Sequence, residues 1–393
     1  MPTDLFARET LAGYSPTVLQ EGTVFMAGAG ALANNVALNL ALSGLGNLLV
    51  CDDDVIDISN VTRAPLFTNP DAPGKPKAKV LTQNYLRLAR APAPKTGYAM
   101  KRVEALGLGA FRGVNAIISA VDSFATRAYL AGAARLLGIP FLEAGFKYPL
   151  GNLSVASNRA PEAPCWACFK AAHLDLSASC TLYSQGVQAT GYIPATQSVA
   201  GVFGSLVAEA TIQALHGNFP LDGQFFELNV KTGASRLTSL IPDPECLTGH
   251  RTANNILELD VAADEPVTRI FEAIGSRLKE PRLRLPQPFV LTMPCRSCGQ
   301  VVSIYKPGYE VRTAPTCTTC LTGSPQTEKP AGLLQTISFI ERDDRLSRTR
   351  ARKLGLLPGA LFEIEDPYTH ENLFVRLSGG PDDLFVQKSR RAM

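Results

Sequence analysis

The stretch Val24-Phe25-Met26-Ala27-Gly28-Ala29-Gly30-Ala31-Leu32-Ala33 decides the fold class of this chain. It begins in an apolar run, Thr23 to Ala27, which is typical of a buried strand. Two glycines follow, and after them alanine and leucine recur at helical spacing over Ala31 to Ser43. Glycines at such a turn let the backbone approach a phosphate at the positive end of the helix. The stretch predicts a nucleotide-binding turn, with a plain tight turn of a doubly wound fold as the alternative.

The segments that follow alternate between strand and helix patterns. Ser123 to Leu137 and Pro194 to His216 are Ala-rich and helical in spacing. Short apolar runs indicate strands at Asn47 to Cys51, Asn115 to Ala120, Pro140 to Glu143, Phe225 to Val230 and Ser235 to Leu240. This alternation predicts an α/β fold, a doubly wound and mostly parallel sheet of the Rossmann type.

Composition excludes several classes of protein. The chain has 393 residues, with 38 Lys+Arg against 35 Asp+Glu, and a net charge of +3 gives no support for nucleic acid or an acidic membrane as partner. Apolar residues make up 46% and charged residues 19%, which allows a substantial core. No leader pattern opens the chain and no apolar run approaches about 18 residues, so we expect a cytoplasmic protein.

The composition shifts after His250 and predicts further domains. We expect a first domain over residues 1–250, with a crossover loop at about 169–194. Residues 251–331 follow as a linker, in which Ala262 to Leu278 is expected to be an amphipathic helix, and a zinc ribbon at 292–322. Residues 332–393, in the order strand, basic helix (Asp344 to Leu354), strand, strand, predict a small α+β domain.

Six of the nine cysteines occur in Cys-x-x-Cys pairs. Without a secretion signal the thiols are expected to be reduced, so paired spacings indicate metal before disulfide. Two of the pairs, separated by 18 residues, form a zinc-ribbon pattern; a redox pair is the alternative, but the segment lacks a βαβ setting. The four predicted zinc ligands are Cys295, Cys298, Cys317 and Cys320.

Acidic residues after the second predicted strand add to the nucleotide signal. Asp52 lies 22 residues after Gly30, where an acid suits ribose hydroxyls. The run continues as Asp52-Asp53-Asp54-Val55-Ile56-Asp57-Ile58-Ser59-Asn60-Val61-Thr62-Arg63, and later comes Gly74-Lys75-Pro76-Lys77-Ala78. Ala120-Val121-Asp122-Ser123, with Arg127, completes an ordered set over roughly residues 8–250. This set resembles the ThiF/MoeB/ubiquitin-activating (E1-like) enzyme family, except that Ser123 replaces an expected asparagine.

The resemblance implies that the chain uses Mg-ATP to adenylate the C-terminal carboxylate of a ubiquitin-like or sulfur-carrier protein. Fixed cations are the main catalytic resource for such a step, and hard cations favour carboxylate ligands. Arg63, Lys77 and Asp122 are the implied catalytic residues, with Asp122 holding Mg²⁺. The implied ATP-binding residues are Gly28, Gly30, Asp52, Asp54, Asn60, Arg63, Lys77 and Arg8, the last reaching across a homodimer.

Each of these residues also has a structural interpretation. Asn60 and Arg63 fit the start of an ordinary helix, and Lys77 fits a solvated lysine. Asp122 fits the N-cap of the helix that follows it.

The resemblance also assigns the remaining cysteines. Cys165 and Cys168 match the family's first zinc pair, while Cys246 and His250 stand where the second pair is expected. These four residues are interpreted either as a Cys₃His zinc site or as a degenerate site that no longer binds zinc. Cys180 lies in the crossover loop, where similar enzymes carry a cysteine that forms a thioester or takes part in sulfur transfer, and a spare surface thiol is the alternative. Cys51 is expected to pack in the core.

The segment after residue 332 looks like a ubiquitin-like (β-grasp) domain, of the kind that recruits a conjugating enzyme. The leading hypothesis is therefore a ubiquitin-activating-like enzyme that loads its partner on Cys180 and passes it to a conjugating enzyme. A sulfur-carrier adenylyltransferase for molybdopterin or thiamine synthesis is the alternative within the family. An NAD-dependent oxidoreductase would leave Arg63, Lys77 and the zinc pairs unexplained, and the retained charged set argues against a non-catalytic scaffold.

Overall fold

The computed structural model describes residues 5–67, 72–160, 162–168, 194–246, 248–311, 314–322 and 334–389. The chain divides into two compact units. The first comprises Met1–Val103, Gly113–Thr252 and Phe385–Met393, and the second comprises Glu104–Arg112 and Ala253–Leu384. Each unit has its own sheet and its own hydrophobic core.

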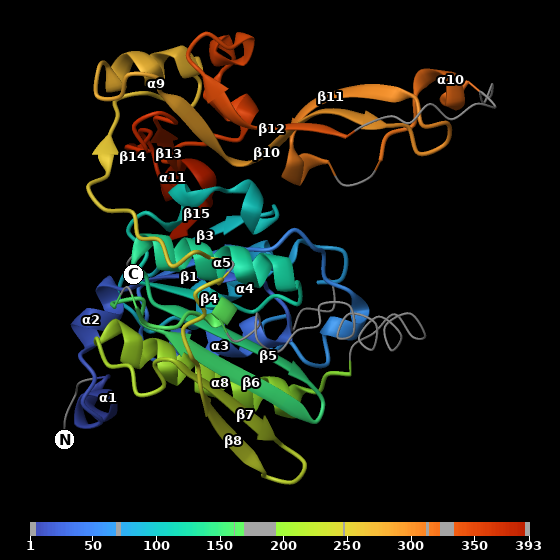
Figure 1. The fold of residues 1–393 in the computed structure, drawn as a ribbon. Helices are drawn as coiled ribbons and strands as arrows, with labels where there is room; N and C mark the ends of the chain where they lie inside the picture. The colour runs from blue at the N-terminus through green and yellow to red at the C-terminus, as the bar shows by residue number, and fades with distance from the viewer. Residues whose placement is uncertain are drawn as a thin grey trace. The chain divides into compact units, whose positions relative to one another are not determined.

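The first unit is built on a nine-stranded sheet (Figure 1). Across the sheet its strands are β15 (Val386–Ser389), β3 (Lys95–Ala99), β2 (Asn47–Cys51), β1 (Thr23–Ala27), β4 (Ala116–Ser119), β5 (Phe141–Lys147), β6 (Leu150–Ala156), β7 (Gln224–Asn229) and β8 (Ser235–Ser239). The five central strands, β3, β2, β1, β4 and β5, run parallel to one another. The outer strands β15, β6, β7 and β8 are antiparallel to their neighbours. The carboxyl ends of the parallel strands therefore lie along one edge, where ligands bind in such folds.

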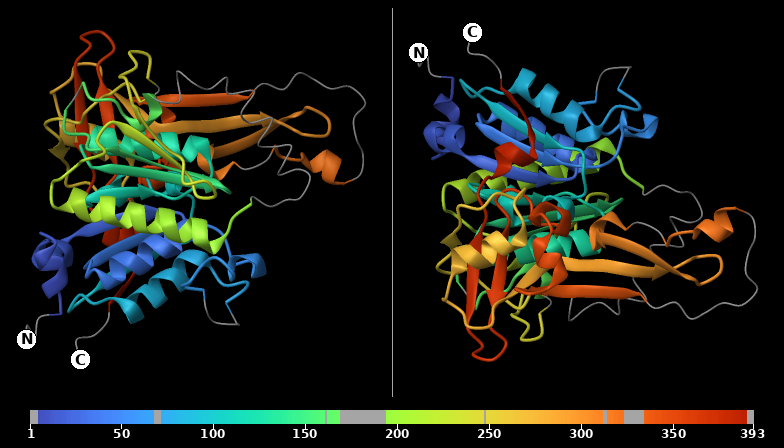
Figure 2. Two further views of the ribbon diagram at one scale, coloured as in Figure 1. Left: turned by 90° about the horizontal axis from the view of Figure 1, so that it is seen from below. Right: turned by 90° about the horizontal axis from the view of Figure 1, so that it is seen from above.

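Helices cover both faces of this sheet (Figure 2). α3 (Ala31–Leu42) and α8 (Gln197–Leu215) share one core with β1, β2 and β4 to β6, while α5 (Phe124–Leu137) packs on β4 and β5. α3 and α8 approach closely, because a Cβ added to Gly204 would lie 2.4 Å from the Cβ of Asn35. α8 is long and apolar enough to cross a membrane, but half of it is buried in this core, which explains its composition. Among the described residues, this unit also contains the helices α1 (Ala7–Leu11), α2 (Pro16–Glu21) and α4 (Lys77–Leu88).

The α/β prediction is confirmed for this unit, with a parallel core and antiparallel outer strands. Thr23 to Ala27 and Asn47 to Cys51 form strands with the predicted bounds. The predicted helix over Ser123 to Leu137 is α5, with Ser123 as its N-cap. β15 has no counterpart in the prediction, since its partner β3 lies far away in the sequence.

The second unit holds a six-stranded sheet. Its strands are β9 (Leu257–Glu258), β10 (Arg282–Pro294), β11 (Val301–Pro307), β12 (Gln335–Glu341), β13 (Leu361–Glu365) and β14 (Asn372–Arg376). β10 pairs with β13 at its start, with β12 along its length and with β11 at its end. Its register shifts between Arg284 and Phe289, where Pro286 and Pro288 have no backbone N–H to donate. β10 to β12 form an extended arm, with α10 (Thr318–Leu321) at its far end (Figure 1).

Two helix predictions in this unit differ from the structure. The predicted helix over Asp344 to Leu354 is two 3₁₀ turns, Arg345–Arg348 and Ala351–Leu354. Residues 349–351, where the two turns meet, bond to another segment instead: Val267 N donates to the Thr349 carbonyl and Ala351 N to the Glu265 carbonyl. The helix predicted over Ala262 to Leu278 is the shorter α9 (Val267–Ile274), which begins after Pro266 and ends before Gly275 at φ +60°.

The units divide between Thr252 and Ala253, two residues after the expected end of the first domain, whereas Glu104–Arg112 and Phe385–Met393 each belong to the other unit. Strands from the predicted linker, ribbon and C-terminal segments share one sheet, and a short helix, α11 (Pro381–Leu384), precedes the strand that returns to the first unit. A ubiquitin-like role for residues 332–393 stays a prediction.

Candidate active site and metal clusters

The glycine turn lies at the carboxyl end of β1. Gly28 has φ +92°, and a Cβ there would lie 2.5 Å from the Ala120 carbonyl oxygen, so no other residue fits. Gly30 is the N-cap of α3, and nothing lies within 4 Å of the position of its Cβ. The positive end of α3 therefore borders open space, as anion binding requires.

Asp52 ties this turn to the end of β2. One carboxylate oxygen accepts a hydrogen bond from Ala29 N (2.7 Å) and the other from Asp54 N (2.8 Å). Burial raises the pKa of Asp52, while the nearby Lys77 ammonium opposes this shift. Because a carboxylate offers about four acceptor positions, Asp52 keeps capacity for a further donor such as a ribose hydroxyl.

Lys77 stands at the same edge, as the first residue of α4. Its Nζ lies 2.8 Å from Asp54 Oδ2, and its backbone N donates to the Asp54 carbonyl at 3.0 Å. The Lys77 side chain is only 15% exposed, whereas that of Asp54 is 68% exposed. This geometry rules out a freely solvated lysine and gives the edge a fixed cation.

Asn60 and Arg63 lie in the loop after β2. Asn60 Oδ1 accepts from Asp57 N at 3.0 Å and closes a capping box around the 3₁₀ turn Ile58–Asn60. Arg63 is half-buried, and its Nη1 donates to the Ser59 carbonyl. Asn60 therefore has the structural role of capping a helical turn. A contact of Asn60 or Arg63 with ATP stays a prediction.

Asp122 follows β4 and is exposed. The N-cap of α5 is Ser123, whose Oγ accepts from Thr126 N at 3.3 Å, so the N-cap interpretation of Asp122 is wrong. The preceding carbonyl, of Val121, accepts from Arg127 Nε at 2.8 Å. Asp122 is therefore presented to solvent by a loop whose backbone is anchored.

Asn34 is a site residue that the sequence analysis missed. Its fully buried side chain donates to the carbonyls of Ala29 (3.0 Å) and Gly30 (2.9 Å) and accepts from Leu66 N (3.1 Å). It fastens the glycine turn to the loop that carries Arg63. The available signal is an asparagine in the first turn of an otherwise apolar helix, where an amide needs a partner.

The two remaining predicted residues lie elsewhere. Arg8 is exposed on α1, none of whose residues is buried. Its reach into a second protomer stays a prediction. Cys180 lies outside the described residues, whereas Cys51 is buried as expected, with its thiol 3.0 Å from the Lys101 carbonyl oxygen.

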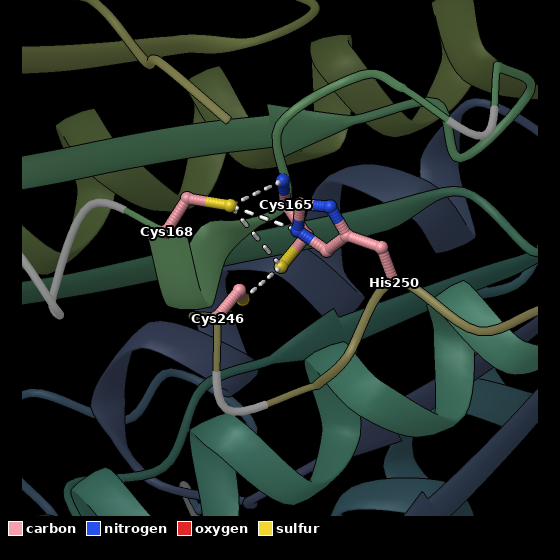
Figure 3. A group of neighbouring side chains, drawn as sticks. All are labelled: Cys165, Cys168, Cys246 and His250. Atoms are coloured by element: carbon pink, nitrogen blue, oxygen red, sulfur yellow. Dashed lines mark hydrogen bonds between the residues drawn. The ribbon is translucent and has the colours of Figure 1, made fainter. Parts of the chain in front are cut away.

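The first metal cluster brings together Cys165, Cys168, Cys246 and His250 (Figure 3). Their ligand atoms all lie within 4.8 Å of one another. Cys165 Sγ is 3.5 Å from Cys246 Sγ and 3.9 Å from Cys168 Sγ, and Cys168 Sγ is 2.9 Å from His250 Nε2. Sulfurs around tetrahedral zinc stand about 3.7 Å apart, so the donor set fits that ion.

Ionisation of all three thiols in this cluster requires a positive ion between them. Hydrogen bonds with Cys168 and Cys246, together with burial, raise the pKa of Cys165. Three thiolates would repel one another in this buried place without a positive ion between them. The spacing and the buried sulfurs fit the Cys₃His interpretation better than a degenerate site.

The second cluster lies on the arm of the second unit. Cys295, Cys298, Cys317 and Cys320 place their sulfurs within 4.8 Å of one another. Cys317 N donates to Cys295 Sγ at 3.2 Å, and the turn after Cys298 uses Gly299 at φ +76°. Backbone donors hold the pKa of Cys295 down to about 6, which favours a thiolate ligand.

Comparison with known proteins identifies the family. The model of the ThiF family matches residues 15–248, more than half of the chain. The chain belongs to the ThiF family and is an ATP-dependent adenylyltransferase of the E1-like type.

Curated relatives agree with this assignment. The sulfur carrier protein adenylyltransferase of Thermus thermophilus is 27% identical over 255 residues, covering 64% of this chain and 86% of that protein. The sulfur carrier protein ThiS adenylyltransferase of Escherichia coli is 28% identical over 51% of this chain and 74% of that protein. For the SUMO-activating enzyme subunit 2 of Dictyostelium discoideum, 26% identity covers 42% of this chain but only 24% of that protein.

Solved structures share the fold. Crystal structures of E. coli MccB with ATP and with MccA-N7isoASN match with TM-scores of 0.52 and 0.54 and identities of 16% and 17%. Each match covers 63% of this chain and 75% of that chain.

Proposed function

We propose that this enzyme adenylates the C-terminal carboxylate of a small sulfur-carrier protein at the carboxyl edge of the parallel sheet. The observation that carries the proposal is the meeting, at that edge, of the glycine turn, the Asp52 carboxylate and the fixed Lys77 ammonium. The relatives named for sulfur-carrier adenylation, which match over 74% and 86% of their own length, support this substrate class.

The chain's residues would share the work as follows. The α3 N-terminus beside Gly28 and Gly30 receives phosphate oxygens, and Asp52 accepts from the ribose. A carboxylate oxygen of the carrier attacks the α-phosphorus of ATP; the bond from that phosphorus to the oxygen bridging to the β-phosphate breaks, and pyrophosphate leaves. The Lys77 ammonium leaves its ion pair with Asp54 and binds the phosphates instead. Together with Arg63 it offsets the negative charge that grows on the phosphate oxygens during the reaction.

Asp122 supplies the carboxylate for a magnesium ion. Bound Mg²⁺ neutralises phosphate charge, and exposed carboxylate oxygen is the ligand that it prefers. Both cysteine clusters would hold zinc, about two ions per chain. The homodimer, through which Arg8 would reach the partner's ATP, also belongs to this proposal.

Pyrophosphate exchange tests the proposal. We expect ATP–pyrophosphate exchange only when the correct carrier is present. Arg63→Ala and Asp122→Asn should each lower it about 100-fold or more. NADH turnover without ATP would contradict the proposal, and so would exchange that both substitutions leave intact.

A thioester on Cys180 is the step that separates ubiquitin-type activation from sulfur-carrier adenylation. The ubiquitin-activating relatives match over only 13% of their length, which gives this step less support. Intact-mass analysis of the wild type and of Cys180→Ala, with and without thiol reductant, distinguishes the two. A reductant-sensitive carrier adduct that disappears in Cys180→Ala, and whose intact mass shows no additional sulfur atom, would favour the ubiquitin-type reaction and a conjugating enzyme as the next partner.

A further inference from the structure

The loop that presents Asp122 is fastened by a buried ion pair. Arg127 Nε holds the Val121 carbonyl at 2.8 Å, and its Nη1 lies 2.6 Å from Oε1 of the fully buried Glu143 on β5. The other oxygen of Glu143 accepts from Asn152 Nδ2 at 3.0 Å. Arg127 also packs on Gly145, where a Cβ would lie 2.9 Å from its Nη2. The guanidinium therefore has one position, and it fixes the backbone next to Asp122.

The same loop contacts the first metal cluster through two aromatic rings. Phe124, two residues after Asp122, is the first residue of α5. Its ring centroid lies 5.2 Å from that of Trp166, and the two ring planes are inclined at 44°. Trp166 is 1% exposed and stands between the ligands Cys165 and Cys168. A shift of the Cys165–Cys168 turn must therefore move the ring on which the start of α5 rests.

The other half of the cluster passes beside the middle of α5. Thr248 Cγ2 lies 3.7 Å from the position of a Cβ on Gly132. The Thr248 hydroxyl lies 3.4 Å from Cys165 Sγ and 3.3 Å from Cys246 Sγ. One helix thus contacts the Cys165–Cys168 turn through Phe124 and passes beside Thr248 at Gly132, and it begins two residues after Asp122.

We propose that the Cys165–Cys168–Cys246–His250 cluster positions Asp122 through Trp166 and Phe124, so that metal in the cluster and Mg·ATP at the active site favour each other. This inference rests on the proposed role of Asp122 as a magnesium ligand. Trp166 and Arg127 are positioning residues, one on each side of the Asp122 loop. Thermodynamic linkage makes the coupling reciprocal: if the cluster's metal tightens Mg·ATP binding, Mg·ATP tightens metal binding by the same factor.

The chain carries its own reporter, because Trp166 is its one tryptophan. The experiment titrates the zinc-loaded, full-length protein with ATP in the presence and absence of magnesium and records tryptophan emission. Binding is measured in parallel by calorimetry, which needs no optical signal. We expect the emission of Trp166 to change with Mg·ATP, to change much less with ATP alone, and to stay constant in Asp122→Asn, which still binds ATP.

Variants at the aromatic contact separate positioning from general stability. Trp166→Ala removes the ring contact and should weaken Mg·ATP binding and raise the magnesium concentration for half-maximal exchange about three- to tenfold. Trp166→Phe keeps an aromatic ring against Phe124 and should restore most of the wild-type magnesium dependence. Phe339→Ala is the matched control, since it removes a ring in the second unit that packs under Arg282 at 4.3 Å. It should lower stability without moving the magnesium dependence.

The outcomes separate this inference from the function on which it rests. Constant Trp166 emission in a wild type that binds Mg·ATP and exchanges pyrophosphate would overturn the coupling and leave the proposed function intact. So would equal magnesium dependence in Trp166→Ala and the wild type. A wild type that binds no ATP by calorimetry would overturn the proposed function itself. If Trp166→Ala does not fold, Phe124→Leu supplies the test: it removes the ring that contacts Trp166 and should raise the magnesium requirement, and an unchanged requirement would overturn the coupling.

Discussion

The two cysteine clusters contain similar ligands in different surroundings. Each has three buried ligands and one half-buried ligand, His250 in the first unit and Cys320 in the second. The first cluster contacts α5 through Trp166, whose ring packs on Phe124 two residues after Asp122, and its Thr248 lies beside Gly132 of the same helix. The second has a small core of its own, in which Val302 packs against the cysteines. The same chemistry can therefore serve an active site in one unit and the rigidity of an arm in the other.

The largest effect is expected from removing one ligand of the first cluster, and removal of one ligand of the second cluster is its control. Cys246→Ser should destabilise the first unit by about 4 kcal/mol or more, as loss of a structural metal does. Cys317→Ser should leave the unfolding of that unit within about 0.5 kcal/mol of wild type, since its contacts are confined to the arm. Urea unfolding followed by Trp166 emission measures the first unit alone. Equal losses in the two variants would show that the clusters are not independent.

Chelation should distinguish the clusters by rate. We expect the ribbon to lose its metal first, because few contacts outside the cluster oppose local opening of the arm. A colorimetric chelator should show two phases of zinc release, and Mg·ATP should slow only the later one. A single phase, or slowing of the earlier phase, would contradict the comparison.

Asn34 tests whether the glycine turn depends on its buried amide. Asn34→Leu leaves the Leu66 N–H without its acceptor and should cost about 1–3 kcal/mol in unfolding free energy. It should also raise the KM for ATP, because the turn loses its tie to the Arg63 loop. Asn39→Ala is the control: Asn39 donates to the Asn35 carbonyl at 2.8 Å on the same helix, and its loss should cost less than about 1 kcal/mol. An unchanged KM in Asn34→Leu would contradict the positioning role.

The smallest effect concerns two acids with opposite shifts. Burial raises the pKa of Asp52, whereas backbone donors, first Glu280 N, lower the pKa of Asp366 in the second unit. Because the pKa of Asp366 is lower in the folded state, its ionised form stabilises the fold. This stability is fully present above the ordinary pKa near 3.8 and is lost as the pH falls through the pKa of the folded state. Below about pH 4, hydrogen-exchange protection of the Lys279 and Glu280 amides should therefore fall. Asp366→Asn should remove this pH dependence; its persistence would assign it to another group.

The sequence predicted what short segments determine. The glycine turn, Asp52 and the second cluster depend on patterns of a few residues or on ligand spacing; the first cluster was implied by the family resemblance, and the structure brings each cluster together. The 344–354 helix prediction was wrong because residues 349–351 bond to 265–267, which local propensity does not contain. Asn34 was missed for the same reason, since its role requires Leu66. The Trp166–Phe124 contact likewise joins segments that no local pattern connects.

The most direct test of the account is the mass of the carrier protein after reaction. The wild-type enzyme, Mg-ATP and the carrier are incubated with pyrophosphatase, and the carrier is then examined by intact-mass and tandem mass spectrometry. The account predicts an AMP adduct on the C-terminal carboxylate, formed by the wild type and at most about 1% as fast by Asp122→Asn. An unmodified carrier despite ATP binding, or an adduct formed equally well by Asp122→Asn, would contradict it.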